Sequence, residues 1–340
     1  MTLDITAPFC FTGPMSGSST LAAHESRSIF RVGNEAYTIA DVIAAAQFRG
    51  ELEPAWQELL RLVACEERAQ QEEREADEET IDRAVQAFRY EHDLITAEEA
   101  ERWLAERGLG LEEFSEYFVR HYWGEADEVT RAEVIPVTSA SAELRTLLVG
   151  ELTLSGELGR MAQRFSWRLA ARQASGGADD AGLNFMAALE EIFRIACEQV
   201  LTPQARQREL GSLRMQLTAL DFEAIEFDSH DAACEALFCV RDDEMSMEEV
   251  AREGRYPFCR EQVLLEDIAP EIQQQFVSAV PGELLEPSEI GGGYRLVRVL
   301  DKSEPNPDNL TVRQRIEHRL LERHFADLVG RYVHWDLLLS

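Results

Sequence analysis

The stretch EIGGGYRLVRVLDK, residues 289–302, places a run of three glycines directly before an apolar segment. Side chains in that segment alternate between two sides, with Tyr294, Leu296 and Arg298 on one side and Arg295, Val297 and Val299 on the other. Alternation of this kind predicts a β-strand. No helical pattern follows the glycines, so the run predicts a bend in the chain and not a phosphate-binding loop.

The composition limits the kinds of partner. With 340 residues, the chain is long enough for two or three compact parts, and 45% hydrophobic residues is ordinary for a globular protein. The formal net charge of -31 is far from ordinary. Such a charge opposes binding to nucleic acids and to anionic membranes, whereas cationic or apolar polypeptides remain possible partners.

The six cysteines show no spacing typical of a metal site or a disulfide framework. They are Cys10, Cys65, Cys197, Cys234, Cys239 and Cys259. None forms a CxxC pair, so we expect reduced thiols, most of them buried. His318 and His324 share a predicted helix but lie six residues apart, on different faces. We therefore expect neither a metal nor another cofactor.

The first residues, 1–27, lack the basic and apolar regions of a secretory signal and read as a disordered lead-in. No run approaches 18 apolar residues, which predicts no membrane span and makes the cytoplasm the expected compartment.

Residues 28–124 are expected to form a helical domain that opens with a hairpin around Gly33 and Asn34. Thr38 and Asp41 begin its first helix, and Pro54 suits the first turn of the next. Residues 125–219 form an additional helical segment, with longer helices over 141–172 and 184–219. Between these helices, ASGGADDAGLN predicts a flexible connection.

Residues 220–302 change to a mixed pattern. LDFEAIEF predicts a strand, Asp228 or Ser229 caps a helix, and Ser246 with Glu249 forms a capping box for MEEVAREG. A loop, a short helix around PEIQQQFVSAV, the turn PGE and the closing strand complete a small α+β unit. Residues 303–340 return to the helical core as one helix, and WDLLLS is a possible strand. The whole chain is therefore predicted to be α+β, mainly helical.

This order of elements resembles the parvulin-type peptidyl-prolyl isomerases. MEEVA and PGELLEPSEIGGGYRLVRVLDK fit that family's second helix, P-G-E turn and closing strand. VGNEAYTIADV and LLERHFADLVGRYVHWDLLL are similar to the helical domain of the chaperone SurA and related bacterial proteins. The resemblance covers most of the chain and is weakest over residues 125–215.

The resemblance also implies where catalytic groups should stand, and the sequence departs from it there. The family's first-strand histidine falls around Ala224 to Glu226, and its closing-strand histidine falls on Arg295. A serine often found three residues before the latter falls on Gly292, and YPFCREQ replaces a glycine-rich loop. Arginine stays charged at any working pH, so it cannot serve as a neutral imidazole or exchange protons.

The apolar groove implied by the resemblance is better kept. Ile268 and Ile272 stand where the family has Met, Leu or Phe, and Phe258, Cys259 and Arg295 complete the expected peptide groove. For Cys259 a structural thiol is favoured over a role in isomerisation, and Arg295 can be either a groove residue or a plain charge on the strand surface.

Three functions follow as hypotheses. The first is a peptide-binding, chaperone-like protein with a degenerate isomerase site, whose partner is an unfolded or precursor polypeptide. The second is an active but weak peptidyl-prolyl isomerase, and the third is an acidic helical scaffold that docks a basic partner. The sequence leaves isomerase activity open and predicts no oligomeric state.

Overall fold

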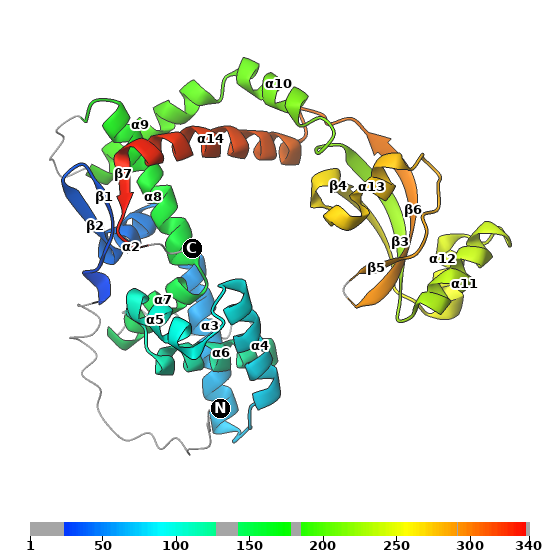
Figure 1. The fold of residues 1–340 in the computed structure, drawn as a ribbon, viewed down its shortest axis with the longest axis horizontal. Helices are drawn as coiled ribbons and strands as arrows, with labels where there is room; N and C mark the ends of the chain where they lie inside the picture. The colour runs from blue at the N-terminus through cyan, green and yellow to red at the C-terminus, as the bar shows by residue number, and fades with distance from the viewer. Residues whose placement is uncertain (1–23, 127–141, 178–184, 291, 338–340) are drawn as a thin grey trace. The chain divides into compact units, whose positions relative to one another are not determined.

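The computed structural model describes residues 24–126, 142–177, 185–290 and 292–337 (Figure 1). The chain divides into two compact units. The first comprises Met1–Ala196 and Phe325–Ser340, and the second comprises Cys197–His324. Helices dominate the described residues and two antiparallel sheets accompany them, which confirms the mainly helical α+β class.

The first unit is built from helices and one small sheet. Its elements are β1 (Ser28–Val32), β2 (Glu35–Thr38), α2 (Ile39–Phe48), α3 (Glu53–Gln71), α4 (Glu78–Glu91), α5 (Ala97–Arg107), α6 (Leu111–Ala126), α7 (Ala142–Leu154), α8 (Glu157–Ala174), most of α9 (Phe185–Val200), the end of α14 (Leu310–Tyr332) and β7 (Val333–Trp335).

Its sheet has the order β2-β1-β7, so strands from the two ends of the chain lie side by side. Phe30 on β1 pairs with Trp335 on β7. Asp336 accepts hydrogen bonds from Ser28 Oγ at 2.7 Å and from Arg31 Nε at 3.0 Å, which fixes the last strand to the first. Phe30 also packs edge-to-face on Phe165 of α8, which joins the sheet to the helical core.

The second unit surrounds a four-stranded sheet. Its elements are α10 (Pro203–Ser212), β3 (Ala219–Phe227), α11 (His230–Arg241), α12 (Met247–Gly254), β4 (Phe258–Leu264), the 3-10 turn η1 (Leu265–Asp267), α13 (Pro270–Ser278), β5 (Ser288–Ile290), β6 (Gly293–Ser303) and the first part of α14. The strand order is β4-β3-β6-β5, with the nine-residue β3 inside the sheet.

Local signals in the sequence account for several boundaries. The capping boxes Thr38 with Asp41 and Ser246 with Glu249 both form, and Ser229 caps α11. In each case the side-chain oxygen satisfies a backbone N–H that the first helical turn leaves without a partner. The hairpin of β1 and β2 also forms, with Gly33 at φ +61°.

Two sequence expectations were wrong in detail. The expected longer helices over 141–172 and 184–219 are each split, the first at Gly156, whose φ of +73° is a left-handed conformation that ends a helix. The stretch after α12, which the sequence predicts to be a loop, is the strand β4, and it pairs with β3 along its whole length.

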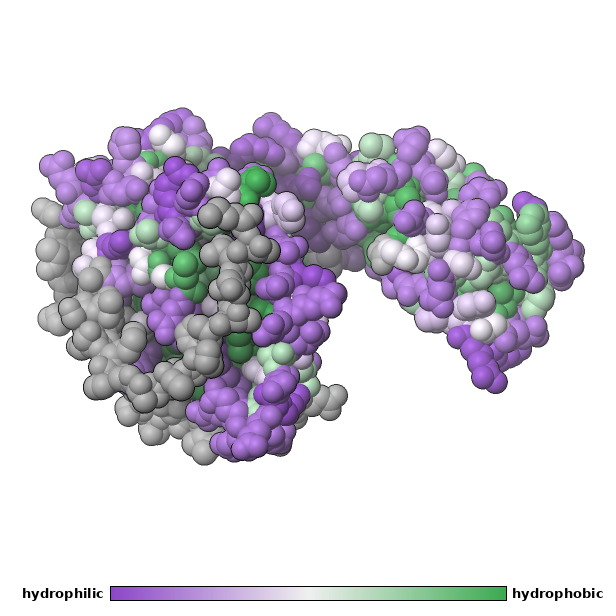
Figure 2. Space-filling view, turned by 60° about the horizontal axis from the view of Figure 1, so that its bottom comes forward, coloured by the Kyte–Doolittle hydropathy of each residue, from purple (hydrophilic) through white to green (hydrophobic). Residues whose placement is uncertain are grey.

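Some expectations fall partly or wholly outside the described residues. The lead-in up to residue 23, Cys10, the connection over 178–184 and the last three residues belong to this group. Of the possible strand in WDLLLS, Trp335 lies in β7. Among the residues that are coloured in Figure 2, most are hydrophilic, and smaller hydrophobic patches lie between them.

Candidate functional site

The sheet of the second unit has two differently covered faces. On one face, Leu220, Phe222 and Ala224 of β3 pack with η1 and α13, and the Phe222 and Phe276 rings meet edge-to-face with centroids 5.6 Å apart. On the other face, Ile225 and Phe227 pack against α11 and α12. We call these the α13 face and the α11 face. They follow from the two-residue repeat of a strand.

Glu226 and Arg295 meet on the α13 face. Their positions are directly paired between β3 and β6, and the Arg295 guanidinium forms an ion pair with the Glu226 carboxylate. The Arg295 side chain is about 25% exposed and that of Glu226 about 51%, so the pair lies at the edge of the apolar cluster and not inside it. A fixed cation and a fixed anion thus occupy neighbouring positions on the two central strands.

Gly292 and Gly293, at the start of β6, explain how this strand reaches its position. Gly292 has a φ of +84°, which L-amino acids with a side chain rarely adopt. At Gly293 an added Cβ would lie 3.0 Å from the Phe227 carbonyl oxygen. The two glycines therefore allow β6 to start close against the end of β3, which sets the register that places Arg295 opposite Glu226.

Cys259 lies on β4 opposite Ala224, on the α13 face and one strand away from the ion pair. Burial raises the pKa of its thiol, the Glu261 carboxylate raises it further, and Arg295 acts in the opposite direction. A thiol with a raised pKa is protonated at neutral pH and is a poor nucleophile. The local electrostatics therefore favour a structural role for Cys259.

The five residues predicted for the groove do not all share one place. Cys259, Ile272 and Arg295 belong to the α13 face, and Ile272 is partly exposed. Ile268 is only 8% exposed and lies within the core cluster of that face. Phe258 pairs with Ile225, so its side chain leaves β4 toward the α11 face, where it is about 37% exposed.

Sequence reasoning located Arg295 but did not single out Glu226 as its partner. Both LDFEAIEF and the closing strand show the alternation of a strand. Pairing them residue by residue also requires the register, which shifts by one residue at the bulge between Asp221 and Phe222. The position of His230 was not predicted from the sequence either. Its ring packs on Tyr294 with centroids 5.3 Å apart, and Tyr294 belongs to the α11 face.

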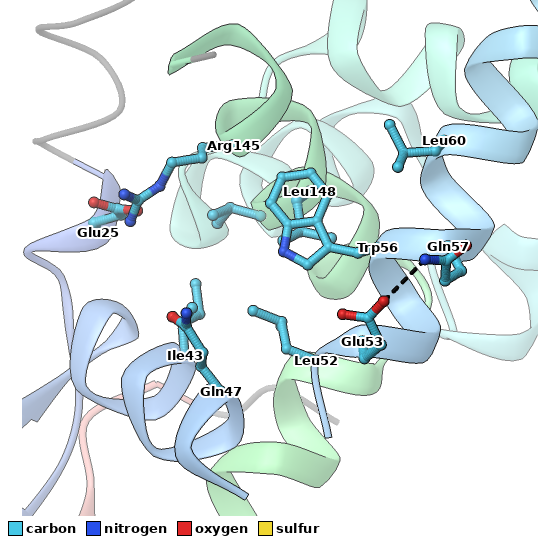
Figure 3. A pocket seen from close by; sticks show the side chains of 11 residues that line it. Glu25, Ile43, Gln47, Leu52, Glu53, Trp56, Gln57, Leu60, Arg145 and Leu148 are labelled. Atoms are coloured by element: carbon cyan, nitrogen blue, oxygen red, sulfur yellow. Dashed lines mark hydrogen bonds and ion pairs between the residues drawn. The ribbon is translucent and has the colours of Figure 1, made fainter. Parts of the chain in front are cut away.

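The first unit contains two cavities that the sequence did not predict. One, of about 330 Å³, is shown in Figure 3: Trp56 lies over the apolar side chains Leu52 and Leu148, and Arg145 pairs with Glu25 at the rim, with 3.2 Å between the joined atoms. Its lining combines these apolar side chains with polar ones, among them Gln47, Glu53 and Gln57.

The other cavity, of about 770 Å³, is lined by rings from separate helices and from β7: Phe88, His92, Trp103, Tyr117, Trp167 and Trp335. These rings come from segments as far apart in sequence as α4 and β7, so the cavity cannot be predicted from any single stretch of sequence. An aromatic surface of this size can hold several residues of an extended polypeptide.

The described residues show neither a metal centre nor a membrane helix. No group of three or more His, Cys, Asp or Glu side chains in the described ranges could hold a metal ion. Within the same ranges, no helix has the length and apolarity needed to span a bilayer.

Comparison with known proteins gives no family for this chain. No protein-family model matches it, and neither does any curated protein sequence. Among solved structures, the foldase protein PrsA from Streptococcus pneumoniae is 12% identical with a TM-score of 0.27, over 90% of this chain and 92% of that one. PrsA from Lactococcus lactis is 10% identical with a TM-score of 0.29, over 92% and 95%. PrsA from Bacillus subtilis is 12% identical with a TM-score of 0.23, over 90% of each chain. Similarity at this level identifies no function.

Proposed function

We propose that this protein is a chaperone-like polypeptide-binding protein whose second unit is a parvulin-like domain without isomerase chemistry. Its partner is an unfolded or precursor polypeptide. The proposed binding surface is the α13 face of the sheet, to which Ile272, Cys259, Arg295 and the core residue Ile268 all belong.

The ion pair of Glu226 and Arg295 is the observation that carries this proposal. Rotation about an X-Pro bond meets a barrier of about 18–20 kcal/mol, and an isomerase must favour the twisted amide. The resemblance to parvulins implies two histidines on the strands that here carry Glu226 and Arg295. A guanidinium paired with a carboxylate keeps its charge and its proton, so it offers neither a neutral imidazole nor proton exchange.

Two further features support a binding role. The net charge of -31 attracts basic polypeptide segments and repels acidic ones. The aromatic cavity of the first unit adds an apolar surface of the kind that holds unfolded chain. The negative charge favours basic clients, and the apolar surface favours unfolded ones, so we expect clients that are both.

The proposal is tested with the full chain in two measurements. Fluorescence anisotropy with labelled peptides, tiled across a basic unfolded protein, is expected to give saturable binding. NMR exchange on X-Pro peptides is expected to give cis-trans rates equal to the uncatalysed rates. Absence of binding to every peptide would disprove the chaperone role.

The same measurements distinguish the alternatives. Catalysed exchange that falls when Ile272 is replaced by alanine would show a weak isomerase instead. Binding that disappears entirely at 0.5 M salt and shows no preference for apolar residues would show an acidic scaffold, because salt screens charge attraction and leaves apolar contacts in place.

A further inference from the structure

We infer that a client polypeptide binds the second unit as an added β-strand along β4. This inference rests on the function proposed above and specifies how the client is held. β4 is the terminal strand of the order β4-β3-β6-β5 and is seven residues long. The strand at the opposite edge, β5, has only three residues. Of the two edges, β4 therefore offers the longer row of backbone groups.

The hydrogen bonds at both ends of β4 show which backbone groups point outward. The Glu226 N–H donates to the Pro257 carbonyl, and the Leu265 N–H donates to the Thr218 carbonyl. The register between β3 and β4 has no bulge, so residues 257, 259, 261, 263 and 265 turn their backbone groups toward β3. Phe258, Arg260 and Gln262 then turn their N–H and C=O groups away from the sheet, where an extended chain can pair with them.

An apolar ledge lies beside this edge on the α13 face. Cys259 and Val263 of β4 and Ile272 of α13 are packed against the core cluster but only partly buried. Alternate side chains of an added strand would cover them. On β4 itself, Arg260, Glu261 and Gln262 are exposed, so the strand is open to solvent along its middle.

The occupant is an extended segment of another polypeptide and not a second copy of this chain. Antiparallel pairing of two copies centred on the middle of β4 would place Glu261 opposite Glu261, and like charges directly opposite each other are destabilising. The net charge of -31 on each copy opposes the same contact. An extended segment that places apolar side chains on the α13 face covers the ledge, and basic residues at either end of that segment are attracted by the negative charge of the chain.

Strand addition has a consequence that separates it from prolyl isomerisation. Main-chain hydrogen bonds do not depend on the side chains, so many sequences can bind. In an added strand, only every second residue turns its N–H toward β4. Methylation of those nitrogens, or proline at those positions, removes donors, whereas the same change one residue along does not.

The first test uses the unmodified full chain and a labelled, end-capped ten-residue peptide whose eight central residues alternate between valine and threonine and whose two terminal residues are arginine. Two versions carry N-methyl groups on alternate sets of backbone nitrogens, so side chains and charge are unchanged. One set is expected to raise the Kd by about tenfold or more, since each lost donor removes a net hydrogen bond, and the other to change it less than about twofold. Equal effects of the two sets would overturn strand addition.

The second test changes the protein at an outward position. Gln262→Pro removes one outward N–H, whereas Gln262→Ala removes the same side chain, with its hydrogen bond to Asp221, and keeps the N–H. Proline is expected to weaken peptide binding about tenfold relative to alanine, with the same urea midpoint for both variants. Equal binding by the two folded variants would refute strand addition while leaving the chaperone role intact. If the proline variant unfolds, the methylated peptides decide the matter. If the unmodified chain binds no peptide at all, both proposals fail.

Discussion

Glu226 and Arg295 stand directly opposite each other on the two central strands and form an ion pair on the α13 face. A second pair, Glu223 with Arg298, joins the same two strands with 3.4 Å between its atoms. It lies on the opposite face, because Glu223 and Glu226 are three positions apart and side chains an odd number of positions apart point to opposite faces of a strand. The two pairs use the same chemistry, so only their place in the fold distinguishes them.

Arg295→Met is expected to change the free energy of unfolding by less than about 1 kcal/mol, since partly exposed ion pairs contribute little. Its buried Nε also finds no acceptor among the described residues, so little is lost with it. Removing the guanidinium leaves the Glu226 carboxylate without its ion-pair partner, so the affinity for a basic peptide is expected to rise several-fold. Arg298→Met is the matched control and should leave affinity unchanged. Urea unfolding and anisotropy measure both effects, and equal affinities for the two variants would remove Arg295 from the proposed groove.

Phe276→Ala tests the core beneath the proposed groove. Phe276 is 3% exposed and packs on Phe222, so its truncation is expected to cost about 3–5 kcal/mol of unfolding free energy. The neighbouring Val277 is about 41% exposed, and Val277→Ala should stay within about 0.5 kcal/mol. Urea unfolding followed by circular dichroism provides the comparison. Similar costs for both variants would contradict the packing of α13 on the sheet.

Gly293→Ala tests the start of β6. The added methyl would lie 3.0 Å from the Phe227 carbonyl oxygen, and we expect a loss of about 1–3 kcal/mol from crowding. Gly211→Ala in α10 is the control, because its Cβ would meet nothing within 4 Å. There the better helix propensity of alanine should stabilise by up to about 1 kcal/mol. Thermal unfolding of both variants should show opposite signs, and a neutral Gly293→Ala would rule out close contact at this turn.

Glu66→Gln tests a carboxylate in the first unit. Burial raises the pKa of Glu66 above its ordinary value, and Glu116 raises it further while Arg120 opposes the shift. A raised pKa means that the charged form is disfavoured in the folded state. This cost is absent below the unfolded pKa of about 4.3 and complete once the pH exceeds the folded pKa.

We therefore expect Glu66→Gln to increase the unfolding free energy at pH 7 and to have little effect near pH 3. Glu67→Gln changes the exposed neighbour and should matter little at either pH. Urea unfolding across this pH range measures the difference. A Glu66→Gln effect that stays constant with pH would show that charge burial is not its cause.

Local features of the fold could be predicted because they depend on residues that are close in sequence. The capping boxes at Thr38 and Ser246 each use a side chain and a backbone group three residues apart. The turn at Gly33 follows from one residue that tolerates positive φ. The break between α7 and α8 was missed although Gly156 marks it, because an isolated glycine within an apolar helical pattern also occurs inside helices.

Features that depend on distant residues could not be predicted in the same way. β4 was missed because most of its residues are exposed, so the alternation expected of a half-buried strand is weak. The sequence led to Arg295 through the parvulin resemblance, but its partner Glu226 depends on register. The aromatic cavity combines Trp103, Trp167 and Trp335 from three separate segments, and only the tertiary fold brings them together.

The pairing of β1 with β7 determines the order in which the chain can fold as it is synthesised. Phe30 cannot pair with Trp335 until the whole of Cys197–His324 has been synthesised and has left the ribosome. The second unit is continuous in sequence and can complete its sheet earlier. The first unit is thus the first to begin synthesis and the last to complete its fold. Its apolar core stays exposed to solvent in the meantime.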